Sequence, residues 1–260
     1  MSAEAAVSAW AESLEPVSVA MLEAAALARG ERVLDLGAGS GQFAVRLAGC
    51  VGPTGTVVAV DPSPDAVAAI ARQASEPGAA SIRAVLGSAE SLALDGEFDA
   101  VVARNSVMYF SDLDRALTRV RRLLRRGGRF VASVYAALEH EPFHAIPLAA
   151  VRRRATLSPP LPEYAAAFEV SADDVAEVLA GCGFEQVRRI EVPVRRTYPS
   201  LASLESSLRA SRSLGELFGR LPEAAVPATW AETLDALGRH VAADGTIVVP
   251  GRQVVVTASA

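Results

Sequence analysis

The segment Asp35-Leu36-Gly37-Ala38-Gly39-Ser40-Gly41 combines a carboxylate with a glycine-rich turn. The apolar residues before the turn predict a buried strand, and the residues after it predict a helix. Glycine permits positive φ angles and lets backbone amides approach a ligand with no Cβ in the way. Asp35 ends the strand, where its carboxylate can pair with a cationic amino group. The segment therefore predicts a ligand site that favours positive charge.

A second acid, Asp61, ends the next predicted strand about 20 residues after the turn, which is the spacing expected for the acid that binds ribose hydroxyls. The run Gly39 to Ala44 also satisfies the G-x-G-x-x-A pattern of dinucleotide sites. A pyrophosphate prefers bare amides at a helix N-terminus, and Asp35 would oppose a dianion there. S-adenosylmethionine instead carries a sulfonium and an ammonium. We therefore favour this cofactor and keep an NAD-dependent oxidoreductase as an alternative.

Five segments together resemble the class I S-adenosylmethionine-dependent methyltransferases, and among them the UbiE-like group (methyltransferase type 11). The similarity extends over about residues 17 to 195. The segments are Asp35-Leu36-Gly37-Ala38-Gly39-Ser40-Gly41, Val60-Asp61-Pro62-Ser63, Gly87-Ser88-Ala89-Glu90, Phe98-Asp99-Ala100-Val101-Val102 and Leu123-Leu124-Arg125-Arg126-Gly127-Gly128-Arg129.

The resemblance implies a role for each matching residue. Gly37, Ala38, Gly39 and Gly41 wrap the methionine moiety with help from Asp35. Asp61 binds the ribose hydroxyls, and Pro62 packs on the adenine. Ala89 offers its backbone amide to the adenine, and Ser88 or Glu90 adds a polar contact. Many relatives have aspartate where Ser88 stands, so the adenine contact differs here.

Arg104 and Asn105 follow the fourth predicted strand, at the carboxyl edge of the sheet where open α/β folds bind ligands. We interpret both as lining the cofactor or substrate pocket; the alternatives are a helix cap for Asn105 and a surface charge for Arg104. The N-P-P-Y-like tetrad of enzymes that methylate base amines is absent from this position. This departure argues against a nucleic-acid substrate.

His144 and His140 follow the fifth predicted strand and are the candidate catalytic bases. Methyl transfer is an in-line displacement that depends mostly on orientation and exclusion of water. A base is needed only where the acceptor must lose a proton, and histidine has a suitable pKa. The alternative is that either histidine packs or lies on the surface.

Composition and charge narrow the possible partners, cofactors and cellular location of the protein. The net charge of the 260 residues is −5, which disfavours nucleic acid as a partner. All 25 basic residues are arginine, so a pyridoxal phosphate linkage to lysine is excluded. Two distant cysteines predict neither a metal site nor disulfides, and no signal peptide or membrane span is evident. We expect a cytoplasmic bacterial protein that acts as a monomer or homodimer.

Short apolar runs alternate with amphipathic stretches, which predicts an α/β fold: a Rossmann-like, seven-stranded, mainly parallel sheet with helices on both faces and helical lid insertions. Ser111 is predicted to cap the helix from Leu113, and Gly127 with Gly128 to end it. The predicted strands are 32–36, 56–60, 82–87, 98–103, 129–135, 186–194 and 253–258, and the predicted helices include 65–74 and 171–181.

We expect one domain over residues 1–260, with a cofactor-binding core at 17–135 and substrate lids at 136–170 and 197–250. The predicted function is methyl transfer from S-adenosylmethionine to the oxygen, carbon or nitrogen of a small, largely apolar acceptor, such as a natural product or a quinone. The alternative is a cyclase or isomerase that keeps the same scaffold without methylating, since fold does not fix function.

Overall fold

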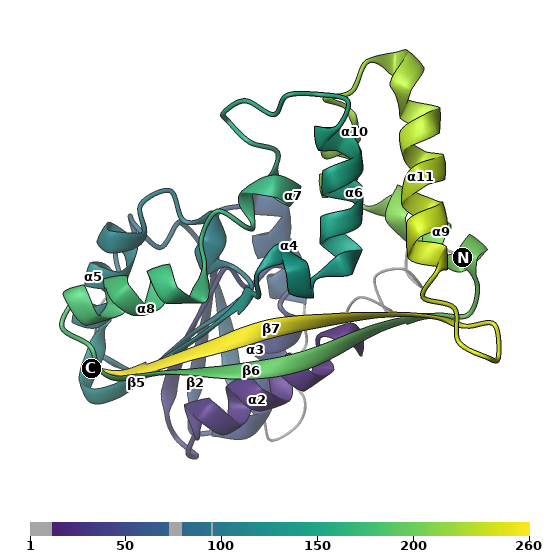
Figure 1. Ribbon diagram of the computed structural model, residues 1–260. Helices are drawn as coiled ribbons and strands as arrows, with labels where there is room; N and C mark the ends of the chain where they lie inside the picture. The colour runs from purple at the N-terminus through teal and green to yellow at the C-terminus, as the bar shows by residue number, and fades with distance from the viewer. Residues whose placement is uncertain (1–11, 73–79, 95) are drawn as a thin grey trace. The chain divides into compact units, whose positions relative to one another are not determined.

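The computed structural model describes residues 12–72, 80–94 and 96–260. Seven strands form one sheet in the order β3-β2-β1-β4-β5-β7-β6 (Figure 1). Their bounds are Arg32–Leu36 (β1), Thr56–Asp61 (β2), Ser81–Leu86 (β3), Phe98–Arg104 (β4), Leu124–Tyr135 (β5), Glu185–Tyr198 (β6) and Ile247–Ser259 (β7). The predicted seven-stranded Rossmann-like sheet is confirmed.

The strands around the glycine turn, β1 to β5, pair in parallel. Strand β1 lies between β2 and β4, while β3 pairs with β2 and β5 with β4. Strands β1, β2 and β4 are continuous apolar runs because both faces of the sheet are covered. The carboxyl ends of these strands therefore meet at one edge of the sheet.

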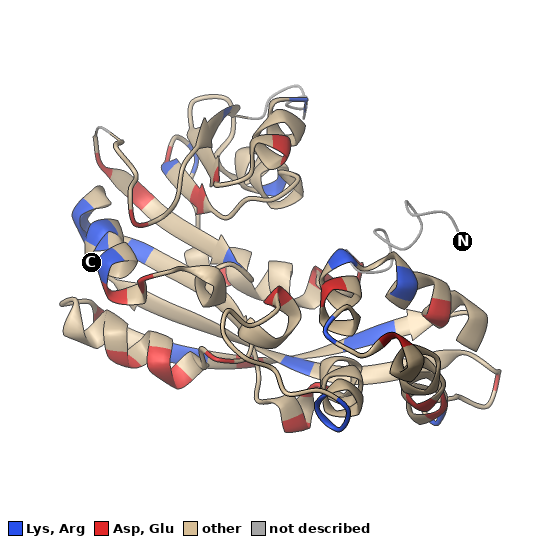
Figure 2. Cartoon of the chain, turned by 90° about the horizontal axis from the view of Figure 1, so that it is seen from above, with Lys and Arg blue, Asp and Glu red and all other residues tan. Residues whose placement is uncertain are grey.

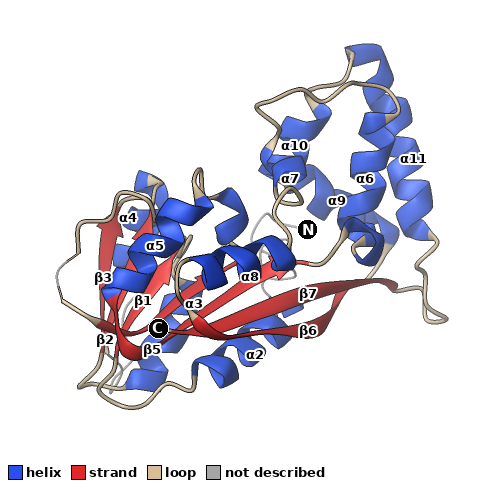
Figure 3. Cartoon of the chain, turned by 60° about the vertical axis from the view of Figure 1, so that its left-hand side comes forward, coloured by secondary structure: helices blue, strands red, loops and turns tan. Residues whose placement is uncertain are grey.

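Helices α5 and α8 lie on one face of the sheet and α2 on the other (Figure 3). The helix predicted over 65–74 is α4, and its last two predicted residues lie outside the described residues. The helices are Glu15–Ala25 (α2), Gln42–Val51 (α3), Pro64–Arg72 (α4), Leu113–Leu123 (α5), Pro142–Arg152 (α6), Glu163–Ala166 (α7), Ala172–Gly181 (α8), Leu201–Ala210 (α9), Arg212–Phe218 (α10) and Val226–Gly238 (α11), with single 3-10 turns at Val107–Tyr109, Leu138–His140 and Glu223–Ala225.

Two predictions about the ends of α5 are wrong. Asp112 caps the helix, because its side chain accepts the Arg115 amide at 2.9 Å, whereas Ser111 donates to Glu90. Gly127 and Gly128 do not end the helix; the chain passes at Leu124 directly into β5. A Cβ at Gly128 would lie 2.9 Å from the Arg125 carbonyl oxygen, so this glycine permits close approach within the sheet.

The chain divides into two compact units. Among the described residues, the sheet unit comprises 17–72, 80–94, 96–134, 171–191 and 254–260, and the helical unit comprises 12–16, 135–170 and 192–253. The predicted lid segments 136–170 and 197–250 fall in the helical unit. Their action as lids, and the single domain, stay predictions.

The helical unit has an apolar core of its own, built from α6, α7, α9, α10 and α11 with the adjoining ends of β6 and β7. Phe143 stacks on Tyr198 with ring centroids 6.3 Å apart, and Phe218 stacks on Trp230 at 4.3 Å. None of the helices in the described ranges is long and apolar enough to cross a membrane.

Acidic and basic residues are spread over helices, strands and loops, as the colours of Figure 2 show. Several arginines pair with acids that are distant in sequence: Arg125 lies 2.6 Å from Asp99, and Arg129 lies 2.5 Å from Glu31. These pairs join β5 to the start of β4 and to the residue before β1, so part of the arginine content has a structural role.

Candidate active site

The glycine turn leaves β1 at the carboxyl edge of the sheet and enters α3. Gly37, Gly39 and Gly41 have φ angles of 68°, 55° and 84°, which L-residues rarely adopt. The amides of Gly37 and Ala38 donate to the Val60 carbonyl, at 2.8 and 3.1 Å, and so fasten the turn to β2. These bonds explain how a short segment without a regular element keeps its shape.

Space around the turn is uneven. A Cβ at Gly37 would lie 2.4 Å from Cβ of Ser106, because the Ser106 hydroxyl donates to the Leu36 carbonyl at 2.7 Å and draws the loop after β4 against the turn. A Cβ at Gly39 would meet no atom of the described residues within 4 Å. The turn is thus packed at Gly37 and open at Gly39, where a ligand can approach the backbone.

Asp35 lies beneath the turn with 1% of its surface exposed. Burial raises the pKa of its carboxyl to about 7, opposed by the charge of Arg104 and reinforced by Asp61. Its Oδ2 atom is buried and has no hydrogen-bond partner among the residues that the structure describes. A buried acceptor without a partner costs free energy, and a bound ammonium would remove that cost.

Asn105 follows β4, the neighbour of β1, and adopts a φ of 51°. Its Oδ1 accepts from the Ser133 hydroxyl at 2.8 Å, while its amide nitrogen Nδ2 is buried without a partner in the described part of the chain. The sheet edge therefore presents one spare acceptor at Asp35 and one spare donor at Asn105. An amino acid group, with its ammonium and carboxylate, matches this pair, so the methionine moiety of S-adenosylmethionine fits.

Arg104 is half-buried between two helices. Its Nη1 donates to the Ser18 hydroxyl of α2 at 2.9 Å, and its guanidinium lies 4.8 Å from the ring centroid of Phe43 in α3. These contacts place Arg104 inside the sheet unit rather than on its surface. The charge of Arg104 also lowers the pKa of Asp35 and so favours the ionised carboxylate.

Asp61 lies against the turn. Its Oδ2 accepts the Gly39 amide and its Oδ1 the Ser63 amide, both at 2.9 Å. Each carboxylate oxygen can accept a second bond, so ribose hydroxyls remain compatible with this arrangement. Pro62, the next residue, is exposed.

The residues assigned to adenine lie after β3. Ala89 is buried, and the hydroxyl of Ser88 lies 3.0 Å from that of Ser91. The Oε1 atom of Glu90 accepts from the amide and hydroxyl of Ser111, at 2.7 and 3.0 Å. Glu90 thus holds the start of α5, and its contact with adenine stays a prediction.

The two candidate bases have different surroundings in the helical unit. His140 is exposed, with its Nε2 atom 3.5 Å from Glu139. His144 is 5% exposed, and its Nδ1 lies 3.0 Å from Oε2 of the fully buried Glu141. Burial, with a smaller contribution from the charge of Arg196, lowers the pKa of His144 to about 4 against the opposing effect of Glu141. His144 is therefore a neutral imidazole near pH 7.

Glu141 and Arg196 are polar neighbours in the surroundings of His144 that the sequence analysis missed. A signal for Glu141 was present, because residues three apart on a helix lie on one face and Glu141 stands three before His144. Arg196 lies in β6, and nothing in the sequence connects it to residues some 50 positions earlier. Only the fold brings them together.

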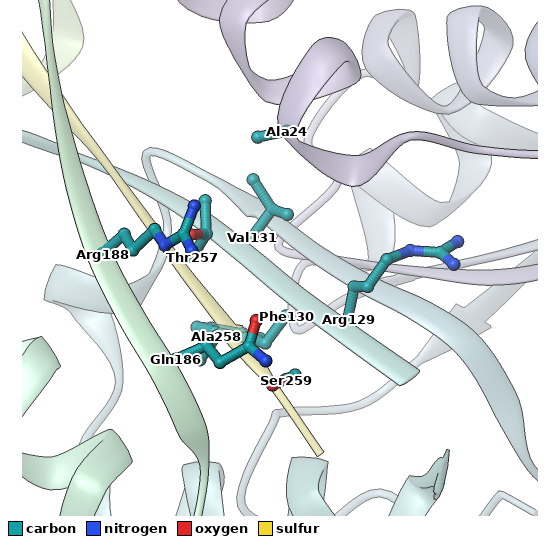
Figure 4. Close-up of a pocket in the computed structure, with 9 residues that line it drawn as sticks. All are labelled: Ala24, Arg129, Phe130, Val131, Gln186, Arg188, Thr257, Ala258 and Ser259. Atoms are coloured by element: carbon teal, nitrogen blue, oxygen red, sulfur yellow. The ribbon is translucent and has the colours of Figure 1, made fainter. Parts of the chain in front are cut away.

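A cavity of about 150 Å³ lies elsewhere in the sheet unit and contains none of the predicted site residues (Figure 4). Its walls come from the first half of β5 and from β6 and β7, with Ala24 of α2 at one side. Gln186 and Arg188 supply part of its polar lining. This cavity adds nothing to the cofactor site.

Comparison with known proteins agrees with this geometry. Residues 33–128 match the family described as "Methyltransferase domain". This segment belongs to the methyltransferase domain family. It holds the glycine turn, Asp61, the residues after β3, and Arg104 with Asn105. The expected resemblance to class I S-adenosylmethionine-dependent methyltransferases is confirmed.

Two relatives extend the match. The nocamycin O-methyltransferase of Saccharothrix syringae is 37% identical over 119 residues, or 45% of this chain and 42% of that enzyme. The aklanonic acid methyltransferase of a Streptomyces strain is 29% identical over 199 residues, or 68% of this chain and 86% of that enzyme. The chain thus spans less than half of the first relative and most of the second, and quinone-biosynthesis C-methyltransferases are further relatives.

Among solved structures, the fold resembles the [4+2]-cyclase SpnF with a TM-score of 0.59 and 22% identity, covering 94% of this chain and 80% of that one. This likeness supports the fold and says nothing of the reaction.

Proposed function

We propose that the methyltransferase domain serves an enzyme that methylates a small, largely apolar acceptor. The observation that carries the proposal is the pair of buried atoms without partners, Oδ2 of Asp35 and Nδ2 of Asn105, at the edge where the glycine turn opens. Both atoms are satisfied by a ligand that presents an ammonium and a carboxylate. A nicotinamide dinucleotide offers no ammonium for Asp35.

Each group of the chain has a defined task in this proposal. When bound, S-adenosylmethionine supplies a methyl group activated by its sulfonium. Asp35 holds the ammonium, Asn105 donates to the carboxylate, and Asp61 accepts from the ribose hydroxyls. His144 accepts the proton of the acceptor where one must leave. Orientation and exclusion of water do most of the remaining catalysis.

The proposed acceptor is a natural product or a quinone-like compound, with oxygen, carbon or nitrogen as the methylated atom. Two relatives with natural-product names support this class. We also propose that the protein acts in the cytoplasm and that it is a monomer or a homodimer. Light scattering coupled to gel filtration tests the oligomeric state directly.

Calorimetry with S-adenosylhomocysteine and with NAD tests the cofactor assignment. We expect micromolar or tighter binding of S-adenosylhomocysteine, weakened by about 1 to 3 kcal/mol in Asp61→Ala, the scale of a hydrogen bond to a charged group. Asp99→Asn is the matched control, because Asp99 lies in the same sheet but bonds the Arg32 amide and Arg125 instead. Binding of NAD alone would refute the proposal.

A second candidate function is cyclisation or isomerisation without methyl transfer, because a protein named as a [4+2]-cyclase shares this fold and fold does not fix function. Incubation with S-adenosylmethionine and a panel of aromatic polyketides and quinones separates the two. Methyl transfer gives S-adenosylhomocysteine and a product heavier by one methylene. A product of unchanged mass, with no cofactor consumed, would replace the first function by the second.

A further inference from the structure

We propose that the cavity beside β5, β6 and β7 binds a small carboxylate through Arg188 and Gln186, and is thus a second ligand site besides the glycine turn. Every residue that lines this cavity belongs to the sheet unit. None of the residues assigned to S-adenosylmethionine or to the acceptor is among them. The inference therefore goes beyond the proposed function and does not depend on it.

Arg188 and Gln186 extend from the edge strand β6 on the face of the sheet where α2 lies. Side chains alternate between the two faces of a strand, so residues 186 and 188 share one face and Arg189 lies on the other. The contacts agree, because Ala24 of α2 lines the cavity while Arg189 pairs with Asp173 of α8 on the opposite face. Figure 4 shows the side chains of Gln186 and Arg188 reaching from β6 toward β5. Both side chains therefore serve the same cavity.

The polar groups of the cavity are mainly hydrogen-bond donors. The guanidinium of Arg188 only donates, and the amide of Gln186 and the hydroxyl of Thr257 can each donate as well. None of the described residues that line the cavity is acidic. A ligand that carries a negative charge and accepts several hydrogen bonds matches this set of groups.

Arg188 supplies the positive charge that is available to a ligand. Arg129 also lines the cavity, but its Nη2 lies 2.5 Å from Oε2 of Glu31, and its guanidinium points away from Gln186 and Arg188 in Figure 4. Arg188 itself forms no ion pair with any residue of the described ranges. A guanidinium pairs well with one carboxylate, whereas a dianion such as phosphate would keep an unpaired charge here.

The size of the cavity limits the ligand to a small metabolite. Its volume of about 150 Å³ is well above the roughly 10–15 Å³ that one ordered water needs, and below the roughly 300 Å³ at which sites for drug-sized ligands begin. Val131 and Ala24 lie together at one side and add apolar surface. A short-chain carboxylate fits, with its charged end at Arg188 and its alkyl chain on Val131 and Ala24.

Gln186 has a strained backbone, which gives an independent reason to assign it a role. Its φ angle is 52°, in the left-handed region that residues with a Cβ rarely adopt. Strain of this kind often marks ligand sites. Glycine adopts the same φ without strain, so Gln186→Gly removes the amide and relieves the backbone together. We expect this variant to melt no lower than the wild type and to bind a carboxylate several-fold more weakly.

A titration of the full-length protein with butyrate, followed residue by residue in proton–nitrogen-15 NMR spectra, tests the site. We expect saturable shifts at the amides of Gln186, Arg188 and Thr257, with a Kd of about 1 mM, which is within reach of a ligand of this size. Butyramide has nearly the same shape without the charge and should bind at least about tenfold more weakly. Equal binding of butyramide, or shifts confined to Asn105 at the edge of the glycine turn, would overturn the proposal.

Arg188→Gln and Arg189→Gln form a matched pair, because each removes one positive charge from neighbouring positions on opposite faces of β6. We expect Arg188→Gln to weaken butyrate binding by about tenfold and Arg189→Gln to change it by less than about twofold. Equal weakening in both variants would mean general attraction to positive charge and no built site. Binding of inorganic phosphate in the cavity without binding of butyrate would refute the choice of a carboxylate. None of these readouts requires that an acceptor be methylated.

Discussion

Burial has opposite effects on the pKa values of two side chains, Asp35 and His144, and in each case favours the uncharged form. It raises the pKa of Asp35 to about 7 and lowers that of His144 to about 4. A neutral acid beneath the glycine turn becomes an anion when an ammonium approaches, and a neutral imidazole is able to take a proton. Each residue is thus held in the state from which its proposed task begins.

Cofactor affinity should therefore depend on pH through Asp35. Below about pH 7 the ligand-free carboxyl is protonated, so pairing with an ammonium releases a proton, and affinity for S-adenosylhomocysteine should fall by up to about tenfold per pH unit. Above pH 7 it should level off, until the ammonium of the ligand itself loses its proton. Calorimetry in buffers of different ionisation enthalpy measures the proton released. Asp35→Asn should bind weakly at every pH, and a steep pH dependence in that variant would contradict this assignment.

The raised pKa of Asp35 also predicts how the stability of the ligand-free fold depends on pH. Stability should fall as the pH rises, whereas cofactor affinity should increase. The ligand-free fold loses stability as the pH rises from about 4 to about 7, because the buried carboxyl must ionise as the unfolded one already has. Asp35→Asn removes this loss. We expect the variant to melt at a higher temperature than the wild type near pH 8 and to show no gain near pH 4, as calorimetric scans would show. Equal melting temperatures near pH 8 would argue that Asp35 is not buried uncharged.

At the scale of elements, continuous apolar runs made β1, β2 and β4 predictable, because strands covered on both faces contain little else. The ends of elements were less predictable. Ser111 and Asp112 are both good caps, and the choice depends on Glu90, which lies 21 positions earlier and binds Ser111. Gly127 and Gly128 resemble a helix stop, but close approach within the sheet requires Gly128.

The positions of the proposed cofactor residues were predictable from sequence, because these residues lie in short segments at the ends of consecutive strands; their contacts with a cofactor stay predictions. The site around His144 was only partly predictable. Glu141 stands one helical turn away, but Arg196 and Gly251 are brought to Glu141 by the pairing of β6 and β7, which no local pattern encodes.

The glycine turn itself can be tested by comparing two substitutions. Both Gly37→Ala and Gly39→Ala carry the cost of a positive φ, about 1 to 2 kcal/mol. Only Gly37→Ala adds overlap with Ser106, for a total of about 2 to 5 kcal/mol. We expect denaturant unfolding to show the larger loss at Gly37, while Gly39→Ala mainly weakens S-adenosylhomocysteine binding. The reverse order would mean that the open space at Gly39 is not where the ligand approaches.

At the scale of the whole molecule, the proposed tasks are divided between the two units. The cofactor residues all belong to the sheet unit, whereas Glu141, His144 and Arg196 belong to the helical unit, which has a separate core. Each unit buries its own apolar residues, so a polar substitution in one should leave the local structure of the other intact. Cofactor binding and proton transfer are therefore expected to be separable by mutation.

Hydrogen exchange measures this separation. S-adenosylhomocysteine at about 100 times its Kd should stabilise the protein by about 2.7 kcal/mol, with added protection in peptides that contain the glycine turn, Asp61 and Asn105. Glu141→Gln should retain this protection in full, because its change is confined to the helical unit, whereas Asp35→Asn should lose most of it at the same ligand concentration. Exchange in the peptide 138–151 should respond to Glu141→Gln and not to Asp35→Asn. Loss of ligand-induced protection at the glycine turn in Glu141→Gln would show that the two tasks are coupled, and the division by unit would then be wrong.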